Sequence, residues 1–261
     1  MKRIISLGAG VQSSTMLLMA LSGEFETMPD AAIFADTQWE SRATYAHLEL
    51  LEAYAQKFDF PIYRVTNGHI LENKQFARMP LYVKNPQGKK AMLRRQCTRE
   101  MKIVPLHRKM REIAGLKPRQ RAKEKLVEIW IGISLDEAAR MRDSREAWAT
   151  HFYPLIERRM SRQDCLLWLD RNNFPRPPKS ACLGCPFHDD KFWRDLKSNS
   201  PEEFAEVCAV DRKIRRGGKG VVCEAFLHRS LVPLEEVDFS TAEERGQGNL
   251  FVNECEGMCG V

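Results

Sequence analysis

The sequence predicts an α/β protein: a Rossmann-like parallel sheet with helices on both faces, followed by a cysteine-rich C-terminal extension. Strand-like apolar runs alternate with helical patterns, which is typical of a parallel sheet. A chain of 261 residues is long enough for one large α/β core with an appendage. We therefore expect an α/β domain over residues 1–160, with a helical, metal-binding extension over residues 161–261 packed on it.

The expected elements follow one another in a regular order. Short apolar runs predict strands at residues 4–7, 31–35, 61–65 and 127–133. Helical patterns separate them, at residues 16–21, 42–58 and 103–113. No apolar run approaches the length of a membrane span, and the N-terminus lacks a signal-peptide pattern. The sequence therefore predicts a cytoplasmic protein with no membrane partner.

The first expected strand leads into the most informative segment, Gly8 to Thr15. Its residues are small or carry hydroxyls, so backbone N–H groups can approach anionic oxygens before the next helix presents its positive end. No Lys follows Gly10, which excludes a Walker A motif, and the third Gly of a dinucleotide fingerprint is missing. The segment predicts a phosphate-binding loop of another type, with a glycine-rich turn that binds nothing as the alternative.

Three further segments extend this pattern. They are Asp36-Thr37 after the second strand, the Cys97-x4-Lys102-x2-Pro-Leu run, and Pro154-Leu-Ile ahead of Ser161-x2-Asp. Together with the loop they resemble the phosphoadenosine phosphosulfate reductase branch of the adenine nucleotide alpha-hydrolase superfamily, the PP-loop ATP pyrophosphatases. The resemblance covers most of residues 1–190. The loop departs from the family's Ser-Gly-Gly-x-Asp-Ser at one charged position, where this chain has Gln12.

The resemblance implies that the chain binds ATP with Mg²⁺. The implied nucleotide-binding residues lie in the loop and near the ends of expected strands: Ser6, Gly8, Ala9, Gly10, Gln12, Ser13, Ser14, Phe34, Asp36, Thr37 and Gly132. Arg94, Arg95 and Arg140 are expected to contact substrate or phosphate, and Lys102 is expected to be a catalytic cation. Asp136 and Glu137 suit the first turn of a helix, where capping alone explains acidic residues.

Eight cysteines in a reducing compartment indicate metal binding or sulfur chemistry rather than a disulfide framework. Cys182 and Cys185 have the spacing that lets two thiolates share a metal, and Cys97 lies among basic residues that favour a thiolate. By resemblance these three are expected to hold a [4Fe–4S] cluster, with an open iron or a fourth ligand from His188, Cys255 or Cys259. Zinc is the alternative metal. The remaining thiols, Cys165, Cys208 and Cys223, are expected to be buried hydrophobes.

The C-terminal tail and the rest of the chain differ in charge, which suggests different roles. The net charge is +6, but residues 235–261 contain seven acids and one base, so the rest of the chain carries +12. Basic clusters beside a nucleotide site favour a nucleic-acid partner, although a solvated basic face explains any single cluster. In the tail, Cys255 and Cys259 are candidates for a sulfur relay, and incidental cysteines on a docked terminus are the alternative.

The resemblance thus implies an ATP pyrophosphatase that adenylates a nucleic-acid oxygen for sulfur insertion, releasing AMP and pyrophosphate. The pattern is most similar to the small pyrophosphatase subunits of DNA phosphorothioation systems, so DNA is favoured over tRNA. A cysteine desulfurase or another sulfur-donor protein is the expected partner. A tRNA thiolase, a sulfonucleotide reductase and a non-enzymatic, metal-stabilised nucleic-acid-binding subunit are the alternatives.

Overall fold

The computed structural model describes residues 1–72, 79–85, 87–122, 124–215 and 223–240. It divides the chain into two compact units, which are described separately. Unit 1 contains residues 1–67 and 99–180, and unit 2 contains residues 68–98 and the part from residue 181 onward. This division is not the same as the two parts expected from the sequence, 1–160 and 161–261. Residues 161–180 pack with the first unit, and residues 68–98 supply strands to the second.

Unit 1 is built on a five-stranded parallel sheet with the order β3-β2-β1-β6-β7. Its strands are β1 (Lys2–Leu7), β2 (Ala31–Asp36), β3 (Ile62–Thr66), β6 (Val127–Ile131) and β7 (Ala149–Phe152). The first four coincide with the predicted runs, and the predicted α/β fold class is confirmed. The fifth was not predicted, because β7 is short and only Ala149 in it is buried.

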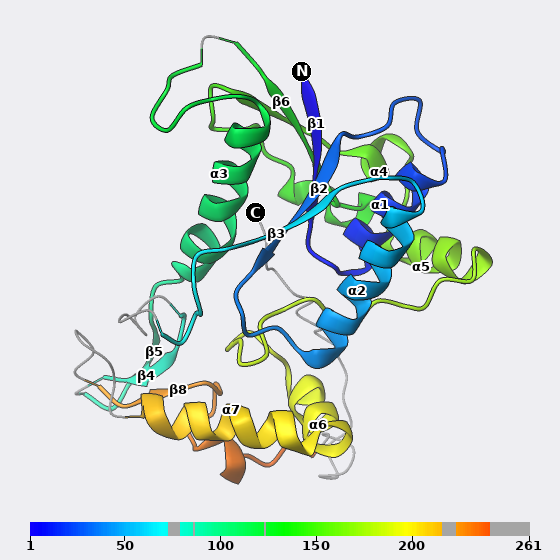
Figure 1. The fold of residues 1–261 in the computed structure, drawn as a ribbon. Coiled ribbons are helices and arrows are strands. Elements are labelled where there is room, and N and C mark those ends of the chain that lie inside the picture. The colour runs from blue at the N-terminus through cyan, green and yellow to red at the C-terminus, as the bar shows by residue number, and fades with distance from the viewer. Residues whose placement is uncertain (73–78, 86, 123, 216–222, 241–261) are drawn as a thin grey trace. The chain divides into compact units, whose positions relative to one another are not determined.

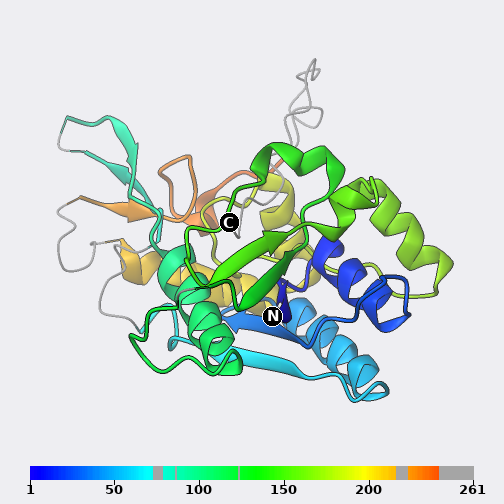
Figure 2. The ribbon, with the colours of Figure 1, turned by 90° about the horizontal axis from the view of Figure 1, so that it is seen from above.

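Helices cover both faces of this sheet, as Figures 1 and 2 show. Neighbouring residues of β1 point to opposite faces: Ile5 packs with α1 (Val11–Leu21), α2 (Arg42–Gln56) and α5 (Arg162–Arg171), whereas Ile4 packs with α3 (Val104–Ile113). A short helix, α4 (Pro154–Glu157), adds Leu155 to the first of these cores. Burial on both faces explains why the central strands read as continuous apolar runs.

Three helical segments differ from the prediction in ways that matter for the site. Helix α1 begins at Val11 instead of residue 16, so the hydroxyl residues of the loop form its first turn. The acidic segment after β6 forms a 3₁₀ helix, η3 (Leu135–Arg140). A π-helix, η2 (Thr98–Ile103), precedes α3 and carries Lys102. Both short elements place polar side chains at the sheet's carboxyl edge.

Unit 2 contains a small antiparallel sheet with the order β5-β4-β8 and two longer helices. Its elements are β4 (Tyr82–Lys84), β5 (Lys90–Met92), α6 (Asp190–Asn199), α7 (Pro201–Ile214), β8 (Ala225–Phe226) and η4 (Leu234–Glu236). Strands of two or three residues leave no periodicity to detect, so the sequence did not predict them. Across the described ranges, no helix is both long and apolar enough to cross a membrane.

Candidate functional site

The phosphate-loop candidate lies where the order of strands in the unit 1 sheet reverses. From β1 the chain adds β2 and then β3 on one side, and later adds β6 and β7 on the other. In open α/β sheets, ligands bind at such a switch point, outside the carboxyl ends of the strands. Here the two ends are the loop of Gly8, Ala9 and Gly10 after β1, and the segment from Gly132 to Ser134 after β6.

The first turn of α1 has no side-chain cap. Gly10 is the N-cap residue, with extended backbone. The first turn also contains no acidic residue. Ala9 is fully buried and has a φ of +56°, a left-handed conformation that non-glycine residues seldom adopt. The first N–H groups of this 11-residue helix therefore have the orientation and the dipole that phosphate binding requires.

The hydroxyl groups of the loop shape it from within. Ser13 Oγ accepts a hydrogen bond from Gly8 N at 3.1 Å and donates to Gly10 O at 3.4 Å. Ser14 is fully buried, with its hydroxyl 2.9 Å from His47 Nε2. Thr15 Oγ1 donates to Val11 O at 2.9 Å. Ser14 thus has an internal partner, and its predicted contact with a nucleotide stays a prediction.

His47 is buried behind this first turn. Burial lowers the pKa of its imidazole to about 4, because the charged form loses its hydration there. The ring is therefore neutral at pH 7 and can share one proton with the Ser14 hydroxyl. No pattern in the sequence indicates this contact, which depends on how α2 packs against α1.

Gly132 lies so close to the first turn of helix α1 that a side chain does not fit there. A Cβ added at this position would lie 2.8 Å from Ser13 N and 2.9 Å from Ser13 Cα. These distances are shorter than van der Waals contact, so only glycine lets the end of β6 meet the first turn of α1. Gly132 therefore has a packing role, and its predicted contact with a nucleotide stays a prediction.

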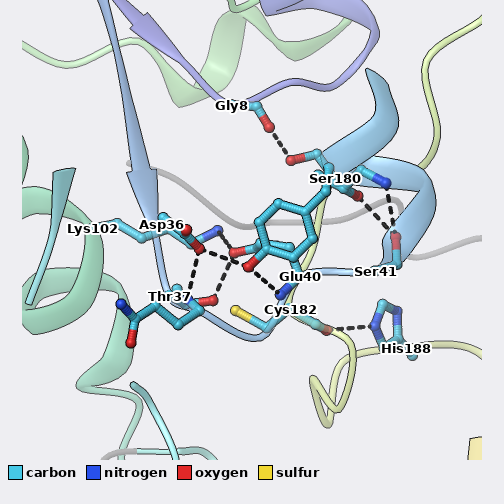
Figure 3. Close-up of polar contacts among 12 residues, drawn as sticks. Gly8, Asp36, Thr37, Glu40, Ser41, Lys102, Ser180, Cys182 and His188 are labelled. Atoms are coloured by element: carbon cyan, nitrogen blue, oxygen red, sulfur yellow. Dashed lines mark hydrogen bonds and ion pairs between the residues drawn. The ribbon is translucent and has the colours of Figure 1, made fainter. Parts of the chain in front are cut away.

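Ser180 is a loop residue that the sequence analysis missed. Its hydroxyl donates to the carbonyl of Gly8, as Figure 3 shows. A Cβ added at Gly10 would lie 3.3 Å from Ser180 Cβ, so the loop is closely covered on that side. No motif distinguishes this serine, because its position depends on the return of the chain from α5.

A second polar group lies at the end of β2 (Figure 3). Asp36 Oδ1 accepts from Gln38 N at 2.7 Å and from the Tyr45 hydroxyl at 2.8 Å. Burial and the bond to Asp36 raise the pKa of Tyr45 well above its ordinary value, so this phenol stays protonated. Asp36 is half-buried at the carboxyl edge, where it was predicted to be.

Next to Asp36, a buried carboxylate engages two of the predicted site residues. Thr37 Oγ1 donates to Glu40 Oε1 at 2.8 Å, and the Lys102 ammonium lies 3.5 Å from the same oxygen. The Glu40 side chain is 1% exposed and that of Lys102 is 19% exposed. Lys102 therefore forms a partly buried ion pair, and Glu40 is a site residue that the sequence analysis missed.

Two other predicted nucleotide residues are in the sheet itself. Phe34 is 3% exposed and belongs to the core beneath α1 and α2. Ser6 is half-buried in β1, between Ile33 and Ile131 of the neighbouring strands. Phe34 thus packs in the core, and the predicted contacts of Phe34 and Ser6 with a nucleotide stay predictions.

A chain of polar contacts connects the loop to η3. Gln12 Nε2 lies 3.3 Å from Ser134 Oγ and 3.1 Å from Glu137 Oε2. The other oxygen of Glu137 forms an ion pair with Arg140. Predicted as a simple capping residue, Glu137 instead contacts the loop position at which the resembled family carries its acid. Asp136, beside it, accepts from Arg162 N at 2.9 Å.

In unit 2, Cys182 and Cys185 lie in consecutive tight turns. Cys185 N donates to Cys182 O at 3.0 Å, and His188 N donates to Cys185 O at 3.1 Å. His188 Nε2 is 2.9 Å from Cys182 O, and a dashed line marks this contact in Figure 3. Of these cysteines, Cys182 is buried and Cys185 is half-buried. This local geometry suits a pair of thiolate ligands with the spacing that metal sites use.

The third predicted ligand belongs to the same unit. Cys97 is half-buried, and nearby Arg95 stacks over the Phe187 ring at 5.4 Å, so the two cysteine-bearing segments are neighbours. Arg94 is exposed. No group of three His, Cys, Asp or Glu residues in the described parts of the chain is gathered closely enough to hold a metal ion. Cys182 and Cys185 therefore form a pair with the spacing of cluster ligands, and Cys97 lies in a neighbouring segment. The three thiols are not gathered into an assembled three-thiolate site.

The other described cysteines differ in how deeply they are buried. Cys165 and Cys208 are buried in α5 and α7, and burial raises their thiol pKa values to about 12 and about 11. Both are therefore protonated, which confirms their predicted role as small hydrophobes. Cys223 is half-buried and precedes β8 rather than lying in a strand, so the prediction of a buried position was wrong for it. Cys255 and Cys259 lie outside the described residues.

No protein-family model matches this chain, and a search of curated proteins finds no similar sequence. Among solved structures, the chain is similar to a U34-tRNA thiolase, NcsA from Methanococcus maripaludis, solved with its [4Fe–4S] cluster. The identity is 15%, the match covers 82% of this chain and 72% of the thiolase, and the TM-score is 0.44. The function proposed for this chain therefore rests on its own residues and their contacts.

Proposed function

We propose that the protein is an ATP pyrophosphatase that adenylates an oxygen of a nucleic acid so that sulfur can replace it. The observation that carries this proposal is the open N-terminus of α1 at the switch point of the sheet. A loop of small residues, an uncapped first turn and the absence of acids within that turn all favour a bound polyphosphate.

In the proposed reaction, the acceptor oxygen attacks the α-phosphorus of ATP, and the bond between the α- and β-phosphates breaks. Pyrophosphate leaves, and its developing charge is stabilised by backbone N–H groups at the start of α1. A Mg²⁺ ion that arrives with ATP would offset the remaining charge. A sulfur nucleophile then attacks the adenylated position, and AMP leaves with the original oxygen.

The groups after β2 are proposed to position the nucleotide rather than to transfer protons. Two hydrogen-bond donors hold the Asp36 carboxylate in place. The Lys102 ammonium forms an ion pair with the buried Glu40 carboxylate. A cation held in this way can bind an anion without first losing side-chain freedom. We therefore keep Lys102 as a phosphate-binding cation and assign it no proton-transfer step.

The acceptor is proposed to be DNA, with tRNA as the outcome that would replace it. The resemblance of the loop and of the Asp-Thr, Cys-x4-Lys and Pro-Leu-Ile segments to DNA phosphorothioation subunits supports DNA. The positive charge of residues 1–234 supports a polyanionic partner of either kind. A cysteine desulfurase or another sulfur-donor protein is proposed to supply the sulfur.

A [4Fe–4S] cluster at Cys97, Cys182 and Cys185 remains part of the proposal, with zinc as the alternative metal. Such a cluster would supply a binding site for sulfide. Cys255 and Cys259 are proposed to relay sulfur. Deleting residues 254–261 should then leave ATP cleavage near the wild-type level while sulfur incorporation stops. If the truncated protein still thiolates its substrate at the wild-type rate, the proposed sulfur relay is wrong.

The decisive experiment measures AMP and pyrophosphate formation from ATP by protein purified without oxygen, alone, with duplex DNA and with tRNA. Replacing Gly10 with Val should abolish ATP binding, because the added side chain meets Ser180 and covers the start of α1. Ser22→Val, at the exposed other end of the same helix, is the matched control and should bind ATP normally.

Calorimetry decides the outcome for both variants, and circular dichroism verifies that they are folded. A folded Gly10→Val protein with wild-type affinity for ATP would overturn the nucleotide site. Release of sulfite from adenylyl sulfate would instead identify a sulfonucleotide reductase. DNA binding without any ATP turnover would identify a non-enzymatic subunit.

A further inference from the structure

The contact between Gln12 and Glu137 joins two parts of unit 1 that are 125 residues apart in sequence. Gln12 lies in the first turn of α1, and Glu137 lies in η3 beyond the end of β6. Both side chains are half-buried, so the hydrogen bond is partly protected from water. A bond of this kind fixes the orientation of both partners.

The chemistry of this contact requires one amide and one carboxylate. Gln12 Nε2 is a donor, and it faces two acceptors, Ser134 Oγ and Glu137 Oε2. A carboxylate at position 12 would place two negative charges about 3 Å apart, which is strongly unfavourable in a partly buried place. The glutamine is therefore matched to Glu137: the negative charge that the resembled loop carries itself is supplied in this chain by η3.

The second carboxylate oxygen of Glu137 contacts Arg140. Glu137 Oε1 and the Arg140 guanidinium form an ion pair in which the side chains are 22% and 24% exposed. Glu137 thus contacts the loop with one oxygen and holds the arginine with the other. Asp136, its neighbour in the same 3₁₀ helix, instead accepts a hydrogen bond from the backbone N–H of Arg162.

We propose that Glu137 is a positioning residue, which holds the Arg140 guanidinium beside the loop so that it can contact the polyphosphate of the bound nucleotide. Gln12 is the partner that makes this arrangement possible. The inference rests on the proposed nucleotide site and assigns to it a third component besides the start of α1 and Lys102. It also gives a reason why this chain has Gln12 where the resembled loop carries an acid.

The test uses isosteric variants, so that charge changes while volume does not. Glu137→Gln should weaken ATP binding about tenfold, the loss expected when a charge-assisted contact is no longer pre-organised. Asp136→Asn removes the same charge from the same helix but should bind ATP within about twofold of the wild type, since it leaves the Gln12 contact intact.

A stability measurement tests the geometry without any nucleotide. Gln12→Glu should lower the thermal midpoint by about 2 °C or more, because it brings two carboxylates together. Adding Glu137→Gln to that variant should restore the midpoint, since a donor and an acceptor face each other again. ATP affinity should stay low in the double variant, because Arg140 has lost its anionic partner.

These measurements separate failure of the inference from failure of the proposed function. If the wild-type protein does not bind ATP, the nucleotide site is wrong, while the thermal midpoints still report on the contact. If the wild type binds ATP and Glu137→Gln binds it as well as Asp136→Asn does, Glu137 positions nothing and the inference is overturned. Equal midpoints for all the Gln12 and Glu137 variants would overturn the contact itself.

Discussion

The loop in unit 1 and the cysteine turn in unit 2 are assembled in opposite ways. The loop is held by residues far away in sequence: Ser180 on Gly8 and Glu137 on Gln12 are separated by 172 and 125 positions. The backbone hydrogen bonds of the cysteine turn instead join near neighbours in sequence, Cys182, Cys185 and His188. A site built from distant segments is pre-organised by the fold, whereas a local turn supplies two ligands and depends on another segment to complete it.

The largest expected effect separates the cysteines. Replacing Cys97, Cys182 or Cys185 with Ser should remove the iron and the brown colour of protein purified without oxygen. Cys165→Ser and Cys208→Ser should keep both, because these thiols are buried and protonated. Iron and sulfide analysis with visible spectra is the measurement. Equal iron content in all five variants would show that the cysteine turn does not bind the cluster. Stoichiometric zinc in place of iron would show that the site binds zinc.

An effect of about 3 kcal/mol is expected from the pH dependence of unit 1. The pKa of His47 is about 4 in the folded protein, below its ordinary value of 6.5. As the pH falls from 6.5 towards 4, the unfolded chain takes up a proton that the folded chain does not, so the free energy of unfolding decreases. Above pH 6.5 this contribution is fully present.

The His47→Gln variant isolates that contribution, because the amide can still bond to Ser14 without titrating. Urea unfolding between pH 4 and 7 should show a shallower loss of stability in this variant than in the wild type. His107 and His228 also have pKa values lowered by burial, and they supply a background slope common to both proteins. Identical slopes would contradict a neutral, buried His47 behind the loop.

A smaller effect, of about 1–3 kcal/mol, is expected where β6 meets α1. Gly132→Ala places a Cβ against the backbone of Ser13 and should lower the free energy of unfolding by that amount. In Gly8→Ala the new Cβ would lie 3.6 Å from Ser13 Oγ, an ordinary contact, so this variant is the control. Urea titration compares them, and equal stability would mean that the two elements separate more easily than the close packing implies.

The sequence predicted what local pattern encodes and missed what tertiary packing decides. Four parallel strands and the loop could be identified because burial on both faces leaves apolar runs, and because phosphate binding restricts residue size. Glu40, His47 and Ser180 could not, since each becomes part of the site only when another segment packs beside it. Glu137 was visible in the sequence, but its i+3 spacing to Arg140 is also typical of an ordinary helix pair.

The surroundings of individual loop residues could not be predicted for a related reason. Ser14 and Gly132 were assigned to the nucleotide because hydroxyls and glycines in such loops often face a ligand. The early start of α1 turns Ser14 towards His47 and brings Ser13 against Gly132. A helix start five residues away from its predicted position was enough to give both residues internal contacts that the sequence does not indicate.

The hydrogen bond from Ser180 to Gly8 has a practical consequence for dissecting this protein. A fragment that ends at residue 160, where the sequence alone suggests a domain boundary, would retain all five strands of the parallel sheet. It would nevertheless lack α5, which packs on α1, and the serine that covers the loop. Such a fragment would expose the apolar face of α1 to solvent and aggregate, so any minimal nucleotide-binding fragment has to continue to Ser180.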